Sequence, residues 1–557
     1  MCGISGIVQK GGQAVCPEQV QAMMDSMAHR GPDDQGQFIE GGVGLGFVRL
    51  SIIDLSIGGH QPMYSADGRH VVIFNCEIFN YIELREALKK EGYCFKTQTD
   101  TEVLLNAYLA WGEQMLHRLN GMWAFVIYYR EEQSLFGARD RYGIKPFYYF
   151  LDQSRFLFAS EIPAILSVLG RKPNPNTAAL FDLLVFNRSD QGMDTCFEEI
   201  QKLNHGHAFK LKIKNKGPLN IDIFKWYDLR NELKPPFEHP EEFRAMLTSS
   251  IELRLRSDVP VGVCLSGGLD SSSIVSLLLK ELKQEGINTF SAIYGKGKYG
   301  DESEFINLYN GQLKHKYFIQ PDENTLLSDI NAFVKAHAEP TANSNPYAQF
   351  KVMKLAKNHV KVTLDGQGAD EALAGYHYFF GYHFKNLLLK ARLGQFVTEV
   401  GQYYAKHHSV YGIKSLLFFL LPAQMRTRMR AMERGYLHPD FYQVHASHSQ
   451  TISGELYGSV DLKEALINHF EYKLEHLLKY EDRNSMWFSI EARVPFLDYR
   501  LVERTLSLDS NQIIHQGMTK FILREAMQGI LPEPIRQRRD KVGFGTPQDE
   551  WFRTPVF

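Results

Sequence analysis

The chain has 557 residues, more than one hydrophobic core usually serves, so two or three domains are expected. Its formal net charge is −2, with 44% hydrophobic and 23% charged residues. These values are typical of a soluble globular protein and argue against a polyanion-binding surface, so nucleic acid is not an expected partner.

Six scattered cysteines form no CxxC pair, which argues against a disulfide framework or a zinc site and for a reducing compartment. The chain opens without a basic and apolar leader. Its longest apolar run, SLLFFLLPA from residue 415, is too short to cross a bilayer. The sequence therefore predicts a cytoplasmic protein with no membrane partner.

The chain begins MCGISG, which places Cys2 directly after the initiator methionine. Removal of the methionine would leave Cys2 with a thiol and a free α-amine, whose pKa is ordinarily about 7.7–8.0. An amine near neutrality can act as the base for an adjacent nucleophile, which is the arrangement of an N-terminal nucleophile. Taken alone, a cysteine at the second position is also explained by chance.

Residues 1–215 contain short apolar runs separated by glycine, which predict the strands of a β-rich sandwich. These runs are GVGLGFVRLSIIDL (42–55), HVVIFN (70–75), MWAFVIYY (122–129), PFYYF (146–150) and RFLFAS (155–160). Helical patterns interrupt them at 81–90 and 101–110. The TDTE that opens the second helix predicts a capping box.

A polar, proline-bearing segment from 214 to 240 predicts a boundary, so we expect domains at 1–215 and 216–557. Beyond it, strand-like runs alternate with helix-length stretches, a pattern typical of a parallel α/β sheet. Residues 380–450 have a helical pattern.

The strongest local signal is VPVGVCLSGGLDSSSIVSLLLKEL at 259–282. A buried strand meets Ser-Gly-Gly and a helix then begins, so backbone N–H groups and the helix dipole can bind an anion. The GK[ST] ending of a Walker A loop is missing. A second corner of the same design, DGQGADE at 365–371, follows another β-branched run.

Two such corners on neighbouring parallel strands would frame one nucleotide site. Asp270 and Asp370 are then candidate Mg²⁺ ligands, because Mg²⁺ takes a few carboxylates together with phosphate oxygens. Each aspartate taken singly is as well explained as a helix cap.

SGGLDSS (266–272) resembles the pyrophosphatase loop of AMP-forming synthetases, and together with MCGI it resembles the glutamine-hydrolysing asparagine synthetase family. HRGPD (29–33), FNCEIFNY (74–81) and ARDRYGIKPFYY (138–149) resemble its class II glutaminase domain. DESEF (301–305), SIEARVPFLD (489–498) and TKFILREAM (519–527) resemble its synthetase domain. The resemblance covers nearly the whole chain, and the motifs occur in the family's order.

The resemblance implies an N-terminal nucleophile glutaminase domain, an α+β fold of the αββα sandwich type, followed by an α/β ATP-pyrophosphatase domain with a parallel sheet and helical insertions. It implies that glutamine and ATP are used to amidate a carboxylate, by default that of aspartate, with release of AMP and pyrophosphate. Ammonia would pass between the sites through an interior channel, and a homodimer is expected from the family alone.

In the first domain, the resemblance implies that Cys2 attacks the side-chain amide of glutamine while its own α-amine takes the proton. The amino acid end of glutamine would be held by Arg49, Glu77 and Asp100, and the oxyanion hole would be formed by Asn75 and the backbone N–H of Cys76.

In the second domain, the resemblance implies that Asp270 and Asp370 hold Mg²⁺ and that Lys520 stabilises charge as the acyl-adenylate forms and breaks. The residues expected around ATP are Leu265, Ser266, Gly267, Gly268, Leu269, Asp270, Ser271, Ser272, Asp365 and Gly366.

Two positions depart from the family pattern. Cys76 replaces a glycine, which would cost about 1–2 kcal/mol if the site needs a positive φ. Independently of φ, its side chain is expected to crowd the glutamine pocket and weaken the glutaminase activity. Gln367, at the acceptor site, replaces a glutamate, and an amide cannot accept a proton as a base. These departures leave open another acceptor (a sugar uronic acid, a peptide or a natural-product acid) and a non-catalytic regulatory homologue.

Overall fold

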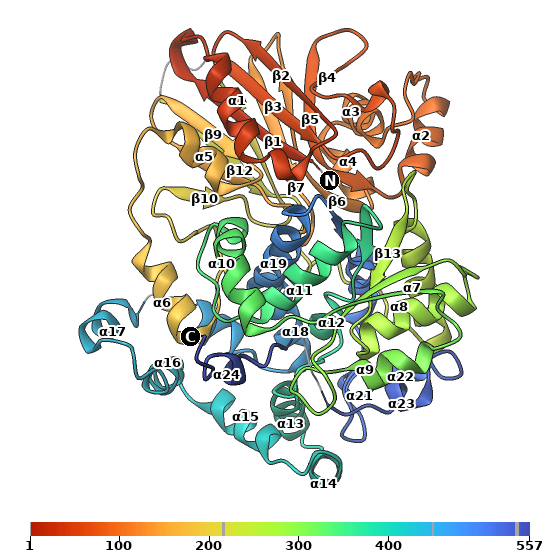
Figure 1. Cartoon of the computed structure of the whole chain (residues 1–557). Coiled ribbons are helices and arrows are strands. Elements are labelled where there is room, and N and C mark those ends of the chain that lie inside the picture. The colour runs from red at the N-terminus through yellow and green to blue at the C-terminus, as the bar shows by residue number, and fades with distance from the viewer. Residues whose placement is uncertain (1, 214–217, 448–450, 541–544, 557) are drawn as a thin grey trace.

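The computed structural model describes residues 2–213, 218–447, 451–540 and 545–556. Figure 1 shows two stacked sheets in the upper part, from the first half of the chain, and a helix-rich lower part from the second half. Within the described ranges, no helix combines the length and the apolar character needed to cross a bilayer.

The first sheet is antiparallel and has the strand order β10-β8-β9-β1-β3-β2. Helices α1 (Pro17–Ser26) and α5 (Ile162–Leu169) cover its outer face. Gly46 allows this approach, because a Cβ there would lie 2.9 Å from Met24 Cγ on α1. The strands are β1 (Gly3–Gln9), β2 (Asp34–Glu40), β3 (Val43–Arg49), β8 (Tyr148–Leu151), β9 (Arg155–Ala159) and β10 (Ile200–Lys202).

The second sheet is also antiparallel, with the order β12-β11-β7-β6-β5-β4. Its outer face carries α2 (Tyr81–Lys90), α3 (Asp100–Trp111) and α4 (Met115–Arg118). Apolar side chains from both sheets form the core between them. The strands are β4 (Met63–Tyr64), β5 (His70–Ile78), β6 (Gly121–Tyr129), β7 (Ser134–Arg139), β11 (His207–Lys212) and β12 (Ile221–Lys225).

The helix predicted at 81–90 is α2, with the same bounds, whereas α3 begins differently from the prediction. Thr99 is its N-cap and accepts a hydrogen bond from the backbone N–H of Thr101. Glu102 does not complete a capping box; it accepts hydrogen bonds from the backbone N–H groups of Lys96 and Thr97. The glutamate therefore fixes the loop before the helix instead of the N-cap itself.

The lower part contains a parallel sheet with the order β15-β14-β13-β16-β17. The chain enters at β13, adds β14 and β15 on one side and then returns to add β16 and β17 on the other. Such a reversal is where an open α/β sheet binds its ligand, at the carboxyl ends of the two adjacent strands. The strands are β13 (Val261–Cys264), β14 (Asn288–Ala292), β15 (His315–Ile319), β16 (Val362–Leu364) and β17 (Glu491–Arg493).

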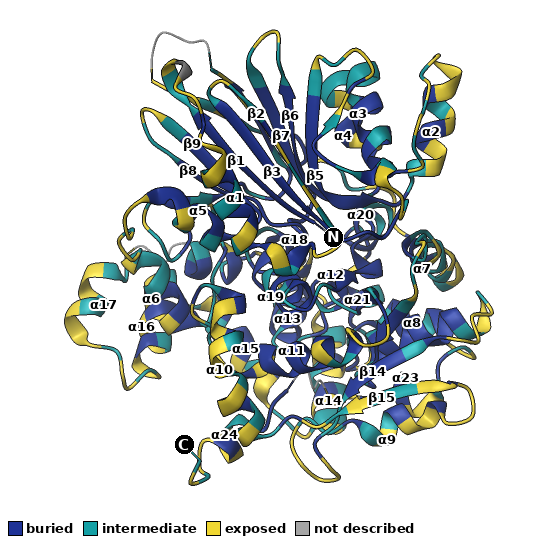
Figure 2. Ribbon diagram, turned by 45° about the horizontal axis from the view of Figure 1, so that its top comes forward, coloured by how far each residue is buried: buried dark blue, intermediate teal, exposed yellow. Residues whose placement is uncertain are grey.

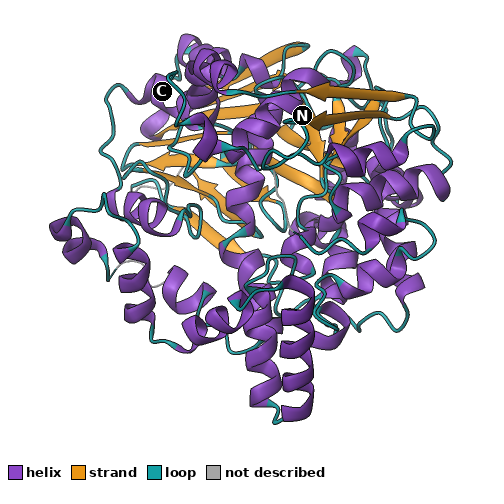
Figure 3. Cartoon of the chain, turned by 60° about the horizontal axis from the view of Figure 1, so that its bottom comes forward, coloured by secondary structure: helices purple, strands orange, loops and turns teal. Residues whose placement is uncertain are grey.

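Helices surround the strands of the molecule, as Figure 3 shows. Within the predicted helical segment 380–450, the described residues up to 447 form α13 to α17. Buried residues concentrate on the strands, and exposed residues lie on peripheral helices such as α17 (Figure 2). The longer helices are α6 (Thr177–Phe186), α7 (Pro240–Arg254), α8 (Leu269–Lys280), α10 (Glu323–His337), α11 (Asn345–Ala356), α13 (Phe379–Leu389), α14 (Leu393–His407), α15 (Tyr411–Leu420), α16 (Ala423–Met432), α17 (Pro439–His445), α18 (Leu462–Tyr472), α19 (Leu474–Met486) and α20 (Tyr499–Thr505).

The shorter helices of the second half are α9 (Ser303–Ile306), α12 (Ala369–Ala372), α21 (Ser510–Ile513), α22 (Phe521–Ala526), α23 (Glu533–Arg536) and α24 (Gln548–Trp551). The expected fold classes are confirmed: an αββα sandwich precedes an α/β unit with a parallel sheet and helical insertions. The expected boundary at 215 and 216 lies outside the described residues. β12 pairs with β11 beyond it, and α7 begins at Pro240.

Candidate active sites

Cys2 lies at the start of β1 and is 8% exposed. Its nitrogen donates to Oδ1 of Asn75, on β5 of the other sheet, at 3.1 Å. Its carbonyl oxygen accepts from Nε of Arg30 at 3.1 Å. Burial raises the pKa of the Cys2 thiol to about 11. The thiol is therefore protonated near neutral pH, and a nucleophilic role requires a base beside it.

Cys76 lies in a regular part of β5, where it faces Trp123 on β6 and does not have a positive φ. Successive side chains of a strand point to opposite faces. The Asn75 side chain points between the sheets toward Cys2, whereas Cys76 packs in the apolar cluster beneath the helices, with Phe74 and Ile78. The expected backbone strain is therefore absent, and Cys76 points away from the Cys2 side of the strand.

Glu77, Asp100 and Glu491 form a buried group of carboxyls beside this site. Burial, followed by the nearby carboxylates of Glu491 and Asp100, raises the pKa of Glu77 well above its ordinary value. Burial also raises the pKa of Asp100 to about 6, although Asp100 Oδ2 accepts from the backbone N–H of Ile78 at 2.9 Å. The guanidinium of Arg493 lies 3.8 Å from Oε2 of Glu77. Such a group favours a bound cation, for example an ammonium.

Arg49 is fixed at the end of β3 by the loop that follows it. Its Nη1 donates to the carbonyl of Ser56 at 2.8 Å, and Nη2 donates to the carbonyl of Asp54. Gly59 permits this arrangement, because a Cβ there would lie 1.8 Å from Nη2 of Arg49. Both Arg49 and Glu77 are close enough to Cys2 to affect the pKa of its thiol. The structure thus gathers Cys2, Arg49, Asn75, Glu77 and Asp100 in one region.

The second site is formed where the neighbouring strands β13 and β16 end. After β13 the chain turns through Gly267, at φ +78°, into α8, and Ser266 and Ser271 join their hydroxyls at 3.0 Å. After β16 it turns through Gly366. A Cβ on Gly366 would lie 3.0 Å from Cβ of Asp270 and 3.1 Å from the backbone nitrogen of Ser271. The absence of a side chain there lets the two predicted corners meet.

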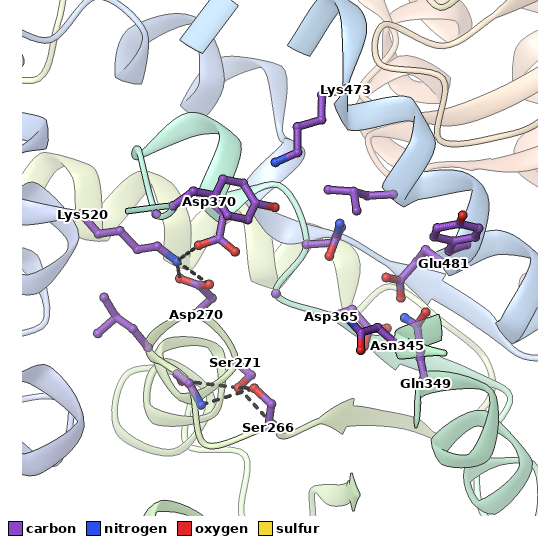
Figure 4. Close-up of a pocket in the computed structure, with 18 of the residues that line it drawn as sticks. Ser266, Asp270, Ser271, Asn345, Gln349, Asp365, Asp370, Lys473, Glu481 and Lys520 are labelled. Carbon is purple, nitrogen blue, oxygen red and sulfur yellow. Dashed lines mark hydrogen bonds and ion pairs between the residues drawn. The ribbon is translucent and has the colours of Figure 1, made fainter. Parts of the chain in front are cut away.

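Asp270 and Asp370 are joined by Lys520, as Figure 4 shows. The Nζ of Lys520 lies 2.6 Å from both carboxylate oxygens of Asp270 and 2.5 Å from Oδ1 of Asp370. Gly375 makes room for this pair, because a Cβ there would meet Asp370 Oδ1 and Lys520 Cε. Within the described ranges, no cluster of three or more His, Cys, Asp or Glu residues is placed to hold a metal. Two carboxylates suit Mg²⁺ when phosphate oxygens complete its shell.

These residues line an open cavity of about 350 Å³. Of the predicted residues, Ser266, Gly268, Leu269, Asp270, Ser271, Asp365, Gly366, Gln367, Asp370 and Lys520 line it. Leu265, Gly267 and Ser272 are outside the lining. Ser272 is fully buried, and its carbonyl accepts from the hydroxyl of Tyr309 at 3.1 Å.

Asp365 and Glu481 form a second carboxyl pair in this cavity, visible in Figure 4. Burial raises the pKa of Asp365, and burial together with the neighbouring Asp365 raises the pKa of Glu481 well above its ordinary value. Thr363 donates its hydroxyl to Asp365 Oδ2 at 2.9 Å. Although position 367 holds an amide, the same cavity therefore contains two carboxyl groups, one from the same loop and one from α19.

Helix α19 connects the two sites. Its Glu481 lines the cavity, and its next residue, Asp482, accepts from both terminal nitrogens of Arg30, at 2.8 and 3.1 Å. Arg30 in turn donates to the carbonyl of Cys2. Sequence reasoning assigned no role to Arg30, Glu481 or Asp482, although HRGPD contains Arg30. The contact between Arg30 and Asp482 joins residues 452 positions apart, and no local pattern reveals such a pair.

Comparison with known proteins matches residues 1–227 to a family model described as a glutamine amidotransferase domain, and residues 242–557 to one described as asparagine synthase. A putative asparagine synthetase [glutamine-hydrolyzing] 2 of Methanocaldococcus jannaschii is 32% identical over 86% of this chain and 94% of its own length.

Asparagine synthetase [glutamine-hydrolyzing] 1 of Bacillus subtilis is 31% identical over 100% of this chain and 88% of its own length. Asparagine synthetase [glutamine-hydrolyzing] 3 of the same organism is 30% identical over 97% and 86%. Together with the two family matches and the two sites, these similarities show that the chain belongs to the glutamine-hydrolysing asparagine synthetase family, as an enzyme that unites an amidotransferase domain with an asparagine synthase domain.

Proposed function

We propose that the protein uses glutamine and ATP to convert a carboxylate into an amide, by default L-aspartate into L-asparagine, with AMP and pyrophosphate as the other products. The observation that supports this most directly is the pairing, in one chain, of the Cys2 site with the two-corner cavity, joined through Arg30 and Asp482 on α19.

In the first site, removal of Met1 would free the α-amine of Cys2 to take the proton of its own thiol, so that sulfur attacks the amide carbon of glutamine. Asn75 and the N–H of Cys76 would stabilise the oxyanion. Arg49 supplies a fixed guanidinium for the carboxylate of glutamine, and the carboxyls of Glu77 and Asp100 suit its ammonium. The α-amine passes the proton to the amide nitrogen, the C–N bond breaks, and ammonia leaves a thioester on Cys2. Attack of water on the thioester then returns the Cys2 thiol and releases glutamate.

A free carboxylate is too poor an electrophile to react with ammonia and must first be activated. In the second site, the acceptor carboxylate therefore attacks the α-phosphorus of ATP, and pyrophosphate leaves. Ammonia then attacks the acyl carbon, and AMP leaves with the bonding electron pair. The loop from Leu265 to Ser272, with Asp365 and Gly366, would hold the nucleotide. Asp270 and Asp370 would hold Mg²⁺, which when bound neutralises phosphate charge. Lys520 lies between these carboxylates, where it can offset charge on the leaving phosphates.

Gln367 lines the cavity where the family pattern has a glutamate, and this observation keeps a different carboxylate acceptor as the second candidate. A cytoplasmic location, a homodimer and an interior ammonia channel stay predictions from the sequence and the family.

The test is to incubate the protein with ATP, Mg²⁺, L-aspartate and glutamine labelled with ¹⁵N in its side-chain amide. We expect ¹⁵N-asparagine by mass spectrometry, with one AMP and one pyrophosphate for each. The Cys2→Ala variant should lose synthesis from glutamine but keep synthesis from ammonium salts. Glutamine hydrolysis without aspartate-dependent AMP would replace aspartate by another carboxylate, and no turnover of either substrate would overturn the proposal.

A further inference from the structure

Arg188 belongs to the amidotransferase half, yet it lines the cavity of the synthetase half. It follows directly on α6, which runs from the sheets down to α16 (Figure 1). Asn187 ends α6 in the left-handed conformation, with φ +55°, and the chain turns there. The first half therefore contributes a cationic side chain to the second site.

The guanidinium of Arg188 forms no ion pair with any carboxylate in the part of the chain that the structure describes. Among the described residues, no carboxylate oxygen lies within 4.0 Å of it, and the residues outside the described ranges include no Asp or Glu. Its Nη1 donates to the carbonyl of Asn187 at 3.0 Å, and its Nε is buried without a hydrogen-bond partner. An arginine has five N–H donors, so most of the hydrogen-bonding capacity of Arg188 is unused.

Arg188 is half-buried, with its Nε fully enclosed, and two neighbouring cations are paired. Lys479 lies 2.6 Å from Asp190 and 3.2 Å from Glu339, and Lys520 contacts Asp270 and Asp370. An unpaired charge that is withdrawn from water is destabilising, and this cost is reduced when an anion binds. Arg188 is therefore arranged to receive an anion from outside the protein.

The surroundings of Arg188 suit a small anionic ligand. Tyr376, Tyr378, Tyr457 and Tyr480 are near enough to affect its pKa. Lys473 adds an amine to the cavity, 3.2 Å from the ring centre of Tyr376 and 3.5 Å from Glu371. Burial lowers the pKa of Lys473 to about 7, and a bound anion would favour its charged form. Hydroxyl groups and cations at this position can bind a carboxylate, while the rings exclude water.

We propose that Arg188 binds the anionic group of the acceptor that does not react, and that this contact sets a preference for a dicarboxylate over a monoacid such as a sugar uronic acid. This inference rests on the proposed function, since it assigns the part of the acceptor that does not react. Two other cations line the same cavity and would face the phosphates of ATP: Lys520, directly before α22, and Arg524, on α22. ATP therefore does not require Arg188.

The experiment measures acceptor-dependent exchange of pyrophosphate into ATP, which reports carboxylate activation without ammonia. L-Aspartate is compared with β-alanine, which lacks only the α-carboxylate, and with succinate and glucuronate. We expect the wild type to prefer aspartate over β-alanine about 10- to 150-fold in kcat/KM, the value of a hydrogen bond to a charged group.

Arg188→Gln should lower kcat/KM for aspartate to the level of β-alanine, leave β-alanine unchanged and leave the KM for ATP unchanged. Arg188→Lys keeps the positive charge but lacks the planar guanidinium that can donate two parallel hydrogen bonds. It should therefore retain part of the preference for aspartate over β-alanine. Arg434→Gln is the matched control, because Arg434 donates to the carbonyl of Val185 at the same end of α6 but does not line the cavity.

Three results would overturn the inference while the proposed function stands. The wild type could use aspartate and β-alanine equally well, or it could support exchange with glucuronate but with no dicarboxylate. The third result is a raised KM for ATP in Arg188→Gln. If no acid supports exchange, the proposed function fails, and calorimetric titration of L-aspartate still tests Arg188. Binding to the wild type that Arg188→Gln abolishes supports the inference, and its absence in both overturns it.

Discussion

At the scale of single residues, the environment of a position determines the effect of a substitution more than its place in a motif does. Cys76 departs from the family pattern next to the proposed oxyanion donor, yet the pleat of β5 points its thiol into the apolar cluster beneath α2 and α3. Asn75, one position earlier, faces Cys2. Adjacent residues of one strand therefore have separate roles, in packing and in the site.

Replacement of Cys76 by glycine should lower the free energy of unfolding by about 1–2 kcal/mol, because it removes a buried side chain and adds backbone entropy within a strand. The KM for glutamine should stay within twofold of the wild type. Urea denaturation and glutaminase kinetics measure the two effects, with Cys94→Ala, at an exposed position, as the control. A large gain in glutaminase activity would show instead that the thiol obstructs the site.

Asp100 should make stability depend on pH in the opposite sense to an ordinary paired aspartate. Burial raises its pKa from 3.8 to about 6, so between those values the folded protein holds a proton that the unfolded chain has released. The free energy of unfolding should therefore fall as pH rises from about 4 to 6, by up to about 3 kcal/mol from this group, and level off above.

The measurement is urea denaturation across that range for the wild type and for Asp100→Asn, which lacks the titrating group. The difference between the two proteins isolates Asp100 from the other acids. We expect the wild type to become less stable relative to Asp100→Asn as pH rises from about 4 to 6. A wild type that instead gains stability relative to the variant would mean that folding lowers the pKa of Asp100.

At the scale of elements, α19 both pairs with charged residues of the two halves and lines the cavity of the second site. Glu475 pairs with Arg139 and Lys202, Lys479 with Asp190 and Glu339, and Asp482 with Arg30. The same helix presents Tyr480 and Glu481 to the cavity. A single rigid element thus contacts both halves through buried charges, which are costly to disturb when one partner is lost.

Asp482→Asn should weaken this connection. We expect a loss of about 3 kcal/mol in the free energy of unfolding, because Arg30 keeps only Glu161 as an acid partner. We also expect more glutamine hydrolysed for each amide formed, because Arg30 contacts the carbonyl of Cys2. Measurement of glutamate and amide in the same reaction gives this ratio.

Lys314→Gln removes an ion pair whose side chains are 65% and 83% exposed and serves as the control. It should change stability by less than about 1 kcal/mol and leave the product ratio as it is. An unchanged ratio in Asp482→Asn would show that α19 holds the halves together without linking their reactions.

At the scale of the whole molecule, the two halves share one interior. One apolar cluster includes Trp123 of β6, Leu364 of β16 and Leu478 of α19, and the rings of Tyr142 and Phe470 meet across the halves at 5.4 Å. Long chains usually unfold domain by domain, but a shared core opposes independent unfolding.

We expect a single calorimetric transition, with loss of glutaminase activity at the temperature where the synthetase half unfolds. ATP with Mg²⁺ should raise that temperature for both readouts, since a ligand that binds one folded half stabilises everything that unfolds with it. Two resolved transitions, with only the second shifted by ATP, would show that the halves are energetically separate.

The sequence predicted what depends on local pattern. The helix at 81–90, the two strand–turn–helix corners and the sandwich strands follow from apolar spacing and glycine position. The grouping of Arg49, Glu77 and Asp100 near Cys2 follows from the family motifs. The sequence also predicted that the two corners lie on neighbouring strands, and the pairing of β13 with β16 agrees. The structure adds that the corners meet closely at Gly366, where a side chain would not fit.

The sequence could not predict what depends on distant contacts. Arg30 and Asp482 meet across 452 positions, and Arg188 reaches the cavity only because α6 extends away from its own sheets. The conformation at Cys76 was also undetermined, because pairing with β6 fixes its φ and no local rule does.

The position of Arg188 has a consequence for recombination between relatives. A chimera joined between residues 227 and 242, where the two family matches separate, would take Arg188 from one parent and the rest of the acceptor pocket from the other. Such hybrids would inherit acceptor preference from both parents. Crossover points that move α6 and Arg188 together with the second half would keep the pocket intact, and they define the exchangeable module of this enzyme more closely than the family boundaries do.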